Sequence, residues 1–494
     1  MPNKQEQVVI IGAGFGGLAT ACLLGQAGYK VTVYESRSQL GGRAGQLKIK
    51  GFTFDTGPSW YLMPEVYERY FGLFGKSPAD YLDLIKLSPA YKVFFESADN
   101  LAVTGDQKQD AKSFESIEPG AGKQLIKYLD SAEQIYNLSL KYFLYTTFQT
   151  KQLLRPEIVG ILPKLLKILR LSMDDYVSKY FNDPKIKQLL EYPSVFLGTS
   201  PFEAPALYHL MSYLDFRQGV WYPRGGIYKI VESLKDLAIQ NNVDFKLGSP
   251  VTHINTQDGK VKSITLSNGS KINADIVISN ADMHYTQTKL LYKSDQDYPA
   301  SYWQKRQAGP SALLMYLGVK GECPELQHHN LIFTSDWQAN FKKIFKDKSW
   351  PVPASIYICK ASQTDSSVAP KGHENIFVLV PLHAQPEINK AEIDRYSDIY
   401  LDQIAEMTGI KDLKARIVYQ KNFGPNDFAE QFNAWQGTAL GLSHKLNQSA
   451  FFRPKTKSRK VKNLYYVGAN VQPGIGLPMC LISAELVFNQ IAGK

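Results

Sequence analysis

The sequence predicts an α/β fold built on a parallel, doubly wound sheet, with mixed α and β segments inserted between its parts. Near the N-terminus, a strand, a glycine-rich turn, a helix and a second strand follow one another. A second glycine-rich strand–turn–helix lies near the C-terminus, and long segments of mixed pattern separate the two. At 494 residues, with 44% hydrophobic and 21% charged residues, the chain suits two domains with a large core.

The N-terminal pattern predicts a βαβ unit. "QVVIIGAG" reads as a buried strand, "FGGLATACLLGQAG" as a helix that ends at Gly28, and "KVTVYE" as a second strand. When a helix connects two strands, the strands pair in parallel. The unit therefore predicts the first two strands of the sheet.

The turn of this unit predicts a dinucleotide site of the Rossmann type. Residues 12–17 read Gly-Ala-Gly-Phe-Gly-Gly, which matches G-x-G-x-x-G. Gly12 allows the tight turn, Gly14 lets the backbone approach a pyrophosphate at the helix N-terminus, and Gly17 allows close packing of helix on strand. Glu35 follows Gly14 by 21 residues and can accept hydrogen bonds from ribose hydroxyls.

A second glycine cluster, "GGRAG" at 41–45, follows this unit. It allows the chain to fold back beside the pyrophosphate, where Arg43 can reach a phosphate. "FTFDTGPSW" at 52–60 adds a further compact turn.

The segment from Asn137 to Met173 is expected to be helical and cationic. Apolar residues recur there at helical spacing with cations between them: Ile161, Leu165, Ile168 and Leu169, with Lys164, Lys167 and Arg170. This pattern suits a helix on an anionic bilayer, and it equally suits an amphipathic helix packed on the protein's own core. Both readings stay open.

The middle of the chain predicts a turn and helix, then a meander of short strands. "WYPRGGIYKIVESLKDLA" is the turn and helix, and residues 244–281 are the meander, with turns at Asp258-Gly259 and Asn268-Gly269. Further on we expect strands at "SALLMYLGV" and "ENIFVLVPL" and a helix near 392–407.

The stretch "LYYVGANVQPGIGLPMCLISAELV" has no charged residue between Asn463 and Ala484 and is long enough to cross a bilayer. Its glycines and prolines disfavour one continuous helix, so we interpret it as a buried strand, a turn and a helix. No transmembrane helix and no signal peptide are expected.

Several function classes are disfavoured. The four scattered cysteines show no C-x-x-C, His328-His329 has no ligand set nearby in the sequence, and H-E-x-x-H and G-x-S-x-G are missing. No metal site is therefore expected. The net charge of +10 comes with no nucleic-acid recognition motif, so no nucleic-acid partner is expected.

Glu35 followed by Gly41-Gly42-Arg43 resembles the FAD-binding proteins of the amine oxidase and carotene desaturase superfamily. The ordered set "GVWYPRGGIYKIVESL", "TDSSVAPKG", "FGPNDFAEQFNAWQGTALGL", "NQSAFFRP" and "LYYVGANVQPGIGLP" is similar to the bacterial phytoene desaturases, including the C30 (diapophytoene) desaturases. The resemblance covers nearly the whole chain.

This resemblance implies an FAD-dependent enzyme that dehydrogenates phytoene or a C30 analogue. It implies a GR2-type, Rossmann-like FAD-binding domain with an inserted mixed α+β substrate domain. FAD contacts are expected from Gly12, Gly14, Phe15, Gly16, Gly17, Glu35, Ser36, Gly42, Arg43, Gly57, Pro58, Ser59, Arg224, Gly225, Val251, Gly468, Ala469, Gly476, Leu477 and Pro478.

The position of the catalytic acid departs from the family pattern. The family carries an acidic residue three positions before an arginine; here Arg155 matches the arginine, whereas Gln152 stands where the acid is expected. Gln152 cannot take a proton at neutral pH. Either Glu157 or Asp215 supplies the acid, or the proton leaves without a dedicated carboxylate, and Arg155 is the candidate catalytic residue.

The expected domain boundaries follow the resemblance. The discontinuous FAD-binding domain is expected at 1–75, 215–290 and 455–494, the substrate domain at 76–136 and 291–454, and a basic helical subdomain that contacts membranes at 137–214. A single dinucleotide fingerprint leaves no second nucleotide site, so oxygen or a quinone is the expected electron acceptor. The expected location is cytoplasmic, at the inner face of the cell membrane.

Two other classes of function remain. A carotenoid isomerase or oxygenase, or a polar amine oxidase, would share this fold, and the amine oxidase would need an accessible polar pocket. A non-catalytic prenyl- or lipid-binding protein of the GDP-dissociation-inhibitor type would share the fold without flavin. The intact Gly41-Gly42-Arg43 and the C-terminal turn argue against that last class.

Overall fold

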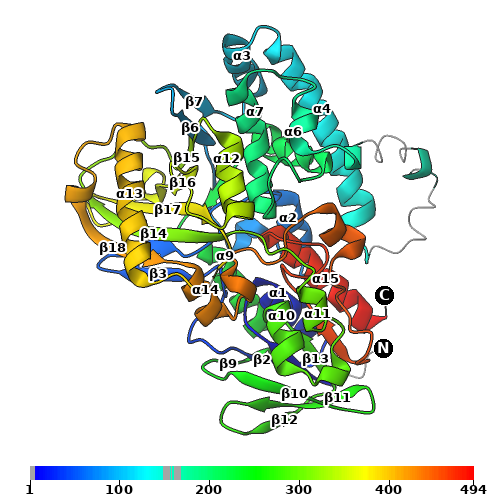
Figure 1. Cartoon of the computed structure of the whole chain (residues 1–494). Coiled ribbons are helices and arrows are strands. Elements are labelled where there is room, and N and C mark those ends of the chain that lie inside the picture. The colour runs from blue at the N-terminus through cyan, green and yellow to red at the C-terminus, as the bar shows by residue number, and fades with distance from the viewer. Residues whose placement is uncertain (1–5, 148–155, 157, 161–167, 386, 494) are drawn as a thin grey trace.

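The computed structural model describes residues 6–147, 156, 158–160, 168–385, 387–493 (Figure 1). Within them, five strands form a parallel sheet in the order β19–β13–β1–β2–β9. The strands are β1 (Gln7–Ile11), β2 (Lys30–Tyr34), β9 (Asp244–Lys246), β13 (Ile276–Ser279) and β19 (Leu464–Tyr466). The Rossmann-like sheet is therefore assembled from the N-terminus, the middle and the C-terminal region of the chain.

Helices cover one face of this sheet and a small second sheet covers the other. Val8 and Ile10 pack in the same core as α1 (Phe15–Gln26), α9 (Tyr228–Gln240) and α15 (Leu477–Ala492). Val9 and Ile11 belong to a separate core with β10 (Val251–Gln257), β11 (Lys260–Leu266) and β12 (Lys271–Asn273). Side chains of a strand alternate between faces, so each face of β1 is buried against its own layer.

The predicted meander is correct only in its centre. β10, β11 and β12 form an antiparallel sheet, and Asp258 and Gly259 both have positive φ in the two-residue hairpin between β10 and β11. The flanking strands β9 and β13 instead pair in parallel within the main sheet. β13 is buried at all four positions, which is typical of a central parallel strand.

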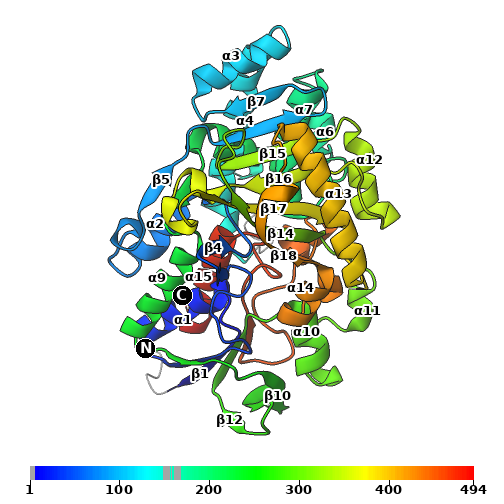
Figure 2. The ribbon, with the colours of Figure 1, turned by 90° about the vertical axis from the view of Figure 1, so that its left-hand side faces the viewer.

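A second large sheet lies above the first (Figures 1 and 2). Within the described residues it has seven strands, in the order β18–β14–β17–β16–β15–β6–β7. Their bounds are β6 (Tyr91–Phe95), β7 (Asn100–Val103), β14 (Ser311–Lys320), β15 (His329–Phe333), β16 (Ile356–Cys359), β17 (His373–Leu382) and β18 (Ile417–Phe423). The predicted strands at "SALLMYLGV" and "ENIFVLVPL" are β14 and β17, which pair antiparallel along their full length.

The two faces of the seven-stranded sheet have different neighbours. On β14, Leu313, Met315 and Leu317 pack with α13 (Lys390–Thr408), the helix expected near 392–407. The alternate residues Ala312 and Leu314 face the opposite side, toward the main core and the large cavity described below. β14, which is buried at every position except Lys320, thus packs into two cores at once.

Shorter elements complete the molecule. β3 (Gln46–Ile49) pairs with β4 (Phe52–Asp55), and β5 (Leu84–Lys86) pairs with β8 (Trp221–Pro223). The remaining helices are α2 (Pro64–Gly72), α3 (Gln107–Ile117), α4 (Ala121–Ser139), α6 (Met173–Val177), α7 (Pro184–Glu191), α8 (Met211–Tyr213), α10 (Met283–Tyr285), α11 (Ala300–Trp303), α12 (Trp337–Lys342) and α14 (Pro425–Phe432). In Figure 1, α3, α4, α6 and α7 gather at the top, beside the seven-stranded sheet.

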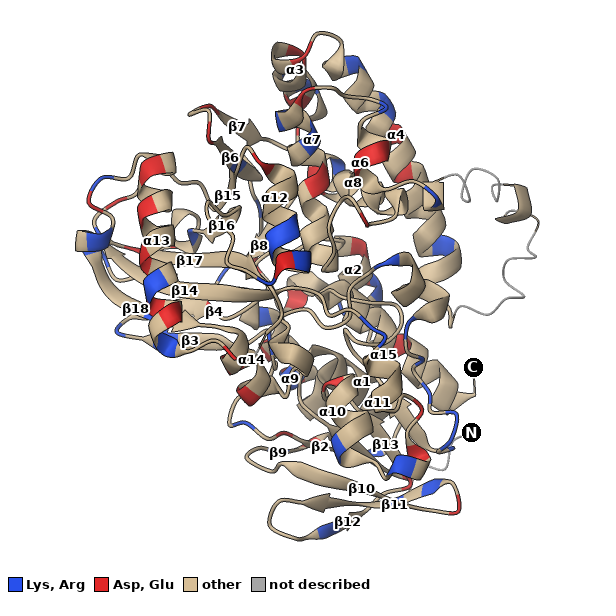
Figure 3. Cartoon of the chain, viewed as in Figure 1, with Lys and Arg blue, Asp and Glu red and all other residues tan. Residues whose placement is uncertain are grey.

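Surface charge is mixed in sign. In Figure 3, α13 is mainly acidic with basic residues toward its lower end, and both signs are interspersed over α3, α4 and α7. Such a mixed surface is typical of a soluble face rather than of a basic stripe that tracks phosphates.

No helix within the described ranges is both long enough and apolar enough to span a bilayer. The uncharged C-terminal stretch forms β19, a turn and the first part of α15, as expected.

Candidate functional site

A single cavity of about 860 Å³ runs between the two large sheets. One end is lined by the glycine-rich turns after β1 and β19, and the other end by apolar side chains of the seven-stranded sheet and the helical region. Its volume and its mainly apolar lining are in the range of natural ligand sites.

The N-terminus of α1 opens onto one end of this cavity. Gly14 is the N-cap residue, has no side-chain cap, and lines the cavity together with Gly12, Phe15 and Gly16. The first turn of α1 carries no acidic residue. The first backbone N–H groups of a helix lack partners within the helix, so this end favours an anionic group such as a phosphate.

Glycine is required here because of close packing. A Cβ on Gly14 would lie 2.6 Å from Nδ2 of Asn280, and one on Gly16 would lie 3.0 Å from Cα of Gly468. A Cβ on Gly17 would overlap the carbonyl oxygen of Gly12. Gly17 therefore packs the helix onto the strand, as expected, and does not line the cavity.

The second glycine cluster folds back against the first. The N–H of Gly41 donates to the carbonyl of Ala13 at 2.8 Å, and a Cβ on Gly42 would lie 3.2 Å from Cα of Gly14. Gly41 and Gly42 both have positive φ, at 99° and 58°, which favours glycine. This contact places Arg43 in the wall of the cavity.

Glu35 lines the cavity and also holds the glycine turn in place. Its Oε2 accepts a hydrogen bond from the N–H of Ala13 at 2.7 Å, and its Oε1 accepts one from the N–H of Arg37 at 2.9 Å. The side chain is buried, and Oε1 also accepts a hydrogen bond from the Ser36 hydroxyl at 3.1 Å. Oε2 therefore retains acceptor capacity for a further donor such as a ribose hydroxyl.

Arg43 and Asp282 form an incomplete charge pair in the cavity wall. Burial lowers the pKa of Arg43, whereas the Asp282 carboxylate raises it. Burial raises the pKa of Asp282 and the charge of Arg43 opposes that shift. Nε of Arg43 has no hydrogen-bond partner among the described residues, although it is buried. A buried guanidinium N–H without a partner is the kind of group that an added phosphate would satisfy.

The C-terminal turn closes the same end of the cavity. Gly468, Ala469, Gly476, Leu477 and Pro478 all line it. Gly476 is the uncapped N-cap of α15 and has a φ of 124°, and Pro478 occupies the first turn of that helix. The helix N-termini of α1 and α15 thus both face the cavity, although about 450 residues separate them.

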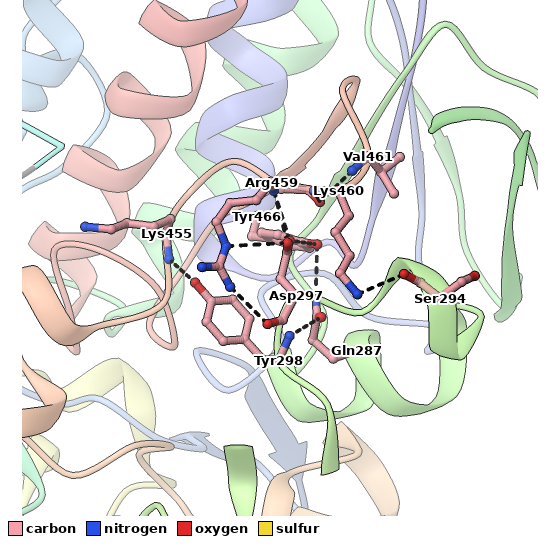
Figure 4. A network of polar contacts seen from close by, with 10 residues as sticks. Gln287, Ser294, Asp297, Tyr298, Lys455, Arg459, Lys460, Val461 and Tyr466 are labelled. Carbon is pink, nitrogen blue, oxygen red and sulfur yellow. Dashed lines mark hydrogen bonds and ion pairs between the residues drawn. The ribbon is translucent and has the colours of Figure 1, made fainter. Parts of the chain in front are cut away.

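A polar network holds the chain that leads into this turn (Figure 4). Buried Asp297 accepts hydrogen bonds from the backbone N–H of Arg459 at 3.1 Å and from the hydroxyl of Tyr466 at 3.3 Å. Gln287 donates to the Tyr466 hydroxyl at 2.9 Å. Tyr466 is the last residue of β19, so this network fixes the strand from which the C-terminal turn departs.

The opposite end of the cavity is apolar and aromatic. The ring of Trp60 stacks on His329 with centroids 4.4 Å apart, and it lies near Tyr192 and Phe196. The lining there includes Ile135, Leu138, Leu207, Leu210, Met211, Leu314, Leu331, Phe333, Trp337 and Phe341. This end suits a hydrocarbon rather than a polar ligand.

The structure brings most of the expected cofactor residues together. The cavity lining includes Gly12, Gly14, Phe15, Gly16, Glu35, Ser36, Gly42, Arg43, Gly57, Pro58, Ser59, Gly468, Ala469, Gly476, Leu477 and Pro478.

Four expected cofactor residues lie outside the lining: Gly17, described above, and Arg224, Gly225 and Val251. Arg224 is half exposed and pairs with Asp83, with Nε and the carboxylate oxygen 2.7 Å apart. The N–H of Gly225 donates to Asp365 at 2.6 Å. Val251 is buried in the core between the main sheet and the β10–β12 sheet.

Sequence reasoning missed Asn280 and Asp282, which follow β13. The side chain of Asn280 lies against Gly14, Gly16 and Gly468, and its Nδ2 donates to the carbonyl of Gly12 at 3.3 Å. Asp282 accepts from Nδ2 of Asn470 at 3.1 Å. The signal was the position of "SNAD" directly after a buried strand, because parallel strands present their carboxyl ends at one edge.

Of the acid–base candidates, Gln152, Arg155 and Glu157 lie outside the described residues. Asp215 is buried, and burial raises its pKa to about 7. The hydroxyls of Tyr192 and Tyr91 donate to its Oδ2. Tyr192 lines the cavity and Asp215 lies behind it.

The expectation that His328-His329 has no ligand set nearby is corrected by the fold. Strand pairing brings Cys359 opposite His329, and one ligand atom from each of His328, His329 and Cys359 lies within 4.8 Å of the others. Burial raises the pKa of the Cys359 thiol to about 12, which disfavours the thiolate that binds metal. Nδ1 of His329 is hydrogen-bonded to the hydroxyl of Tyr357 at 2.8 Å. We therefore interpret the cluster as a packed network.

The residues at the glycine-rich end fit a dinucleotide cofactor. The uncapped N-terminus of α1, a set of glycines that leaves backbone exposed, and a buried guanidinium nitrogen without a partner converge on one end of the cavity. Together they match the charge of a pyrophosphate.

Comparison with known proteins is consistent with this geometry. The family model described as flavin-containing amine oxidoreductase matches residues 15–491. A carotenoid 3,4-desaturase of Haloarcula japonica is 43% identical over 488 residues, covering 97% of each chain. A zeta-carotene-forming phytoene desaturase of Myxococcus xanthus is 34% identical over 493 residues, covering 99% of this chain and 94% of its own.

Among solved structures, an oxidoreductase from Methanosarcina mazei has the same fold. It superposes with a TM-score of 0.64 at 18% identity and covers 99% of this chain and 100% of its own. At this identity the likeness supports the fold alone.

Proposed function

The chain belongs to the flavin-containing amine oxidoreductase family, and on that premise we propose that it is an FAD-dependent carotenoid desaturase. The observation that carries the proposal is the continuity of one cavity. Its glycine-rich end suits a dinucleotide and its other end is apolar and aromatic. A carotenoid is a long hydrocarbon without a polar handle, so its recognition depends on shape and apolar contact.

The relatives support the class of substrate. The Haloarcula japonica and Myxococcus xanthus proteins are named for desaturation of carotenoids and phytoene, and each aligns with nearly the whole of this chain. A polar amine oxidase would need charged or polar groups at the reacting end. Phe196, Leu314 and Phe333 line that end with apolar side chains, which do not suit a charged amine.

The side chains of the protein bind and orient the two ligands. The N–H groups at the start of α1 and the guanidinium of Arg43 would hold the pyrophosphate of FAD, and Glu35 would accept from its ribose. The chemistry that bound flavin supplies is acceptance of a hydride from an allylic carbon of the polyene. The apolar lining excludes water from the reacting carbons.

The proton lost from the neighbouring carbon needs an acceptor. Arg155 remains the proposed catalytic residue by resemblance. Asp215 is the other candidate, because its carboxylate lies behind the cavity wall and accepts a hydrogen bond from Tyr192, which lines the cavity. Oxygen or a quinone is the proposed final electron acceptor.

The substrate would enter from a membrane surface. Leu446 and Phe452 are 48% and 61% exposed, and both also line the cavity. Exposed apolar side chains at a cavity mouth suit contact with a bilayer, in which carotenoids dissolve. We propose a peripheral protein at the inner face of the cell membrane, with the discontinuous FAD-binding, substrate and helical domains predicted above.

Expression in carotenoid-producing cells tests the function. Three host strains would accumulate phytoene, diapophytoene, or a carotenoid whose 3,4 bond is saturated. A gain of conjugated double bonds in one pool, seen as a red shift of the pigment absorption, is expected. An unchanged spectrum in all three hosts would refute the desaturase.

Purified protein separates the remaining rivals. A visible flavin absorption band, with FAD released on denaturation, is expected. Colourless protein that gains no flavin when FAD is added would instead favour the non-catalytic lipid-binding class. Turnover of a polyamine would favour the amine oxidase.

A further inference from the structure

Arg453 is a buried cation in the motif "NQSAFFRP" that the proposed function does not yet use. Its side chain is 1% exposed. Nη2 donates to the carbonyl of Ala469 at 2.7 Å, Nε to that of Val471 at 3.2 Å, and Nη1 to that of Leu442 at 3.5 Å. The guanidinium therefore lies directly behind the C-terminal turn that lines the cavity.

The charge of Arg453 has no counter-charge in the described protein. No carboxylate oxygen of a described residue lies within 4.0 Å of its nitrogens. The titratable groups that face it are the phenols of Tyr208 and Tyr302 and the thiol of Cys480. Burial and the charge of Arg453 together hold the pKa of His444 well below its usual range, so this imidazole is neutral as well.

Arg453 nevertheless stays protonated. Burial lowers its pKa to about 10, which is still far above neutral pH. Burying a charge without an opposite partner is unfavourable, and such charges are usually paired or bind a ligand. Arg43, a half-buried arginine of the same site, has Asp282 to offset its charge.

The cavity is where an anionic partner would lie. Ala469, Cys480 and His444 contact or face Arg453 and also line the cavity. The uncapped N-terminus of α15 points its positive end to the same place. By resemblance to the family, the C-terminal turn before α15 is expected to lie over the flavin ring. The charge of Arg453 and the N-terminus of α15 would therefore both act on that ring.

We propose that Arg453 is a positioning residue that holds the 468–474 turn and supplies the uncompensated positive charge that stabilises the negative charge gained by flavin on reduction. The inference rests on the proposed function, because it requires a bound flavin. Arg453 would thereby raise the reduction potential of the flavin without touching the cofactor.

The test is the midpoint potential of bound flavin, measured by dye-coupled reduction of the purified holoenzyme without any polyene. Arg453→Gln keeps a donor for the Ala469 carbonyl and removes the charge. We expect it to favour oxidised flavin at least tenfold, a fall of about 30 mV for a two-electron couple. Arg453→Lys keeps the charge and is expected to retain most of the wild-type potential.

Arg416 offers a matched control. Its Nε and Nη2 also donate to backbone carbonyls, those of Lys320 at 2.8 Å and Glu322 at 2.6 Å, and it is not part of the cavity lining. Arg416→Gln should leave the potential unchanged. Affinity of the oxidised flavin for sulfite, which rises with nearby positive charge, should fall only in Arg453→Gln.

Equal potentials in wild type and Arg453→Gln would overturn the inference and leave Arg453 as a clamp of the turn. If Arg453→Gln fails to retain flavin, Arg453→Lys decides: a wild-type potential supports the charge effect, and a lowered potential refutes it. Wild-type protein that binds no flavin would refute the proposed function and this inference together.

Discussion

The residues around the cavity affect its chemistry mainly through their charge and through the protonation states that burial imposes. Asp215 shows this most clearly. It is buried, its hydrogen-bond donors among the described residues are the hydroxyls of Tyr192 and Tyr91, and burial raises its pKa to about 7. An aspartate in an unfolded chain ionises near pH 4. The folded protein therefore holds this proton over a range of pH in which the unfolded chain has lost it.

The sign of the effect on stability follows directly. As the pH rises from about 4 to 7, the unfolded chain is favoured by ionisation while folded Asp215 stays neutral, so Asp215 lowers stability progressively across this window. Above pH 7 the penalty is constant. Asp215→Asn removes it, so the free energy of unfolding of the variant relative to wild type should rise by roughly 1–3 kcal/mol between pH 4 and 7. Urea unfolding at a series of pH values measures this.

Asp99 is the control for that series. It is exposed, and a hydrogen bond from Lys185 lowers its pKa, so its effect has the opposite sign and a lower pH window. The free energy of unfolding of Asp99→Asn relative to wild type should not rise between pH 5 and 7. Parallel profiles for wild type and Asp215→Asn would contradict a raised pKa at Asp215.

At the scale of elements, the site depends on how closely α1 lies against β1 and the C-terminal turn. Gly17 sits where any Cβ would overlap the carbonyl oxygen of Gly12, which is backbone and cannot move aside easily. The helix must shift outward to make room, and its N-terminus moves with it. Packing between elements is thus coupled directly to the geometry of the pyrophosphate site.

Gly17→Ala should therefore lower stability and flavin content together. Overpacking of this kind costs about 1–3 kcal/mol. Thermal unfolding and the ratio of flavin to protein absorbance measure the two effects.

Gly72, the last residue of α2, is the matched control because no atom lies within 4 Å of a Cβ built there. Gly72→Ala should leave stability equal or slightly higher, by up to about 1 kcal/mol. Full flavin content in Gly17→Ala would show that the contact is not needed.

Elements with a local pattern could be predicted from the sequence. The βαβ unit at 7–34 and the strand–turn–helix at 464–492 are both correct, because glycines and apolar runs determine them locally. The local pattern places β9 and β13 in a meander. It cannot show that both strands pair in parallel with strands far away in the sequence. Asn280 and Asp282 were missed for the same reason. Their role depends on the position of β13 between β1 and β19.

At the scale of the whole molecule, one cavity joins a charged end to an apolar end and reaches the surface near Leu446 and Phe452. Neither its continuity nor its mouth can be read from the sequence, because residues from almost every part of the chain line it. The amphipathic segment at 137–173 was the sequence-based candidate for membrane contact. Part of it, including Lys164 and Lys167, lies outside the described residues.

The proposed entry route predicts a specific loss of membrane binding. The double variant Leu446→Ser/Phe452→Ser should bind anionic lipid vesicles at least tenfold more weakly. Full burial of such a side chain contributes about 1.5–3 kcal/mol, and roughly half of each is available for burial here. Co-sedimentation with vesicles of phosphatidylglycerol and phosphatidylcholine measures this.

A second exposed apolar pair provides the comparison. Ile239 and Val418 are 52% and 44% exposed and do not line the cavity. Ile239→Ser/Val418→Ser should bind vesicles like wild type. Equal loss in both double variants would indicate general hydrophobic adsorption and not a defined mouth.

The order of strands in the main sheet also has a consequence for biosynthesis. β1 is a central strand, yet β13 follows it by some 265 residues and the glycine-rich turn after β19 follows by about 450. At 5–20 residues per second, a ribosome needs roughly 20–90 s to make that length of chain. Throughout this time the nascent protein displays an apolar, unpaired strand edge beside a half-built cofactor site. We therefore expect yield in recombinant hosts to depend on chaperone supply and growth temperature more than on cofactor supply.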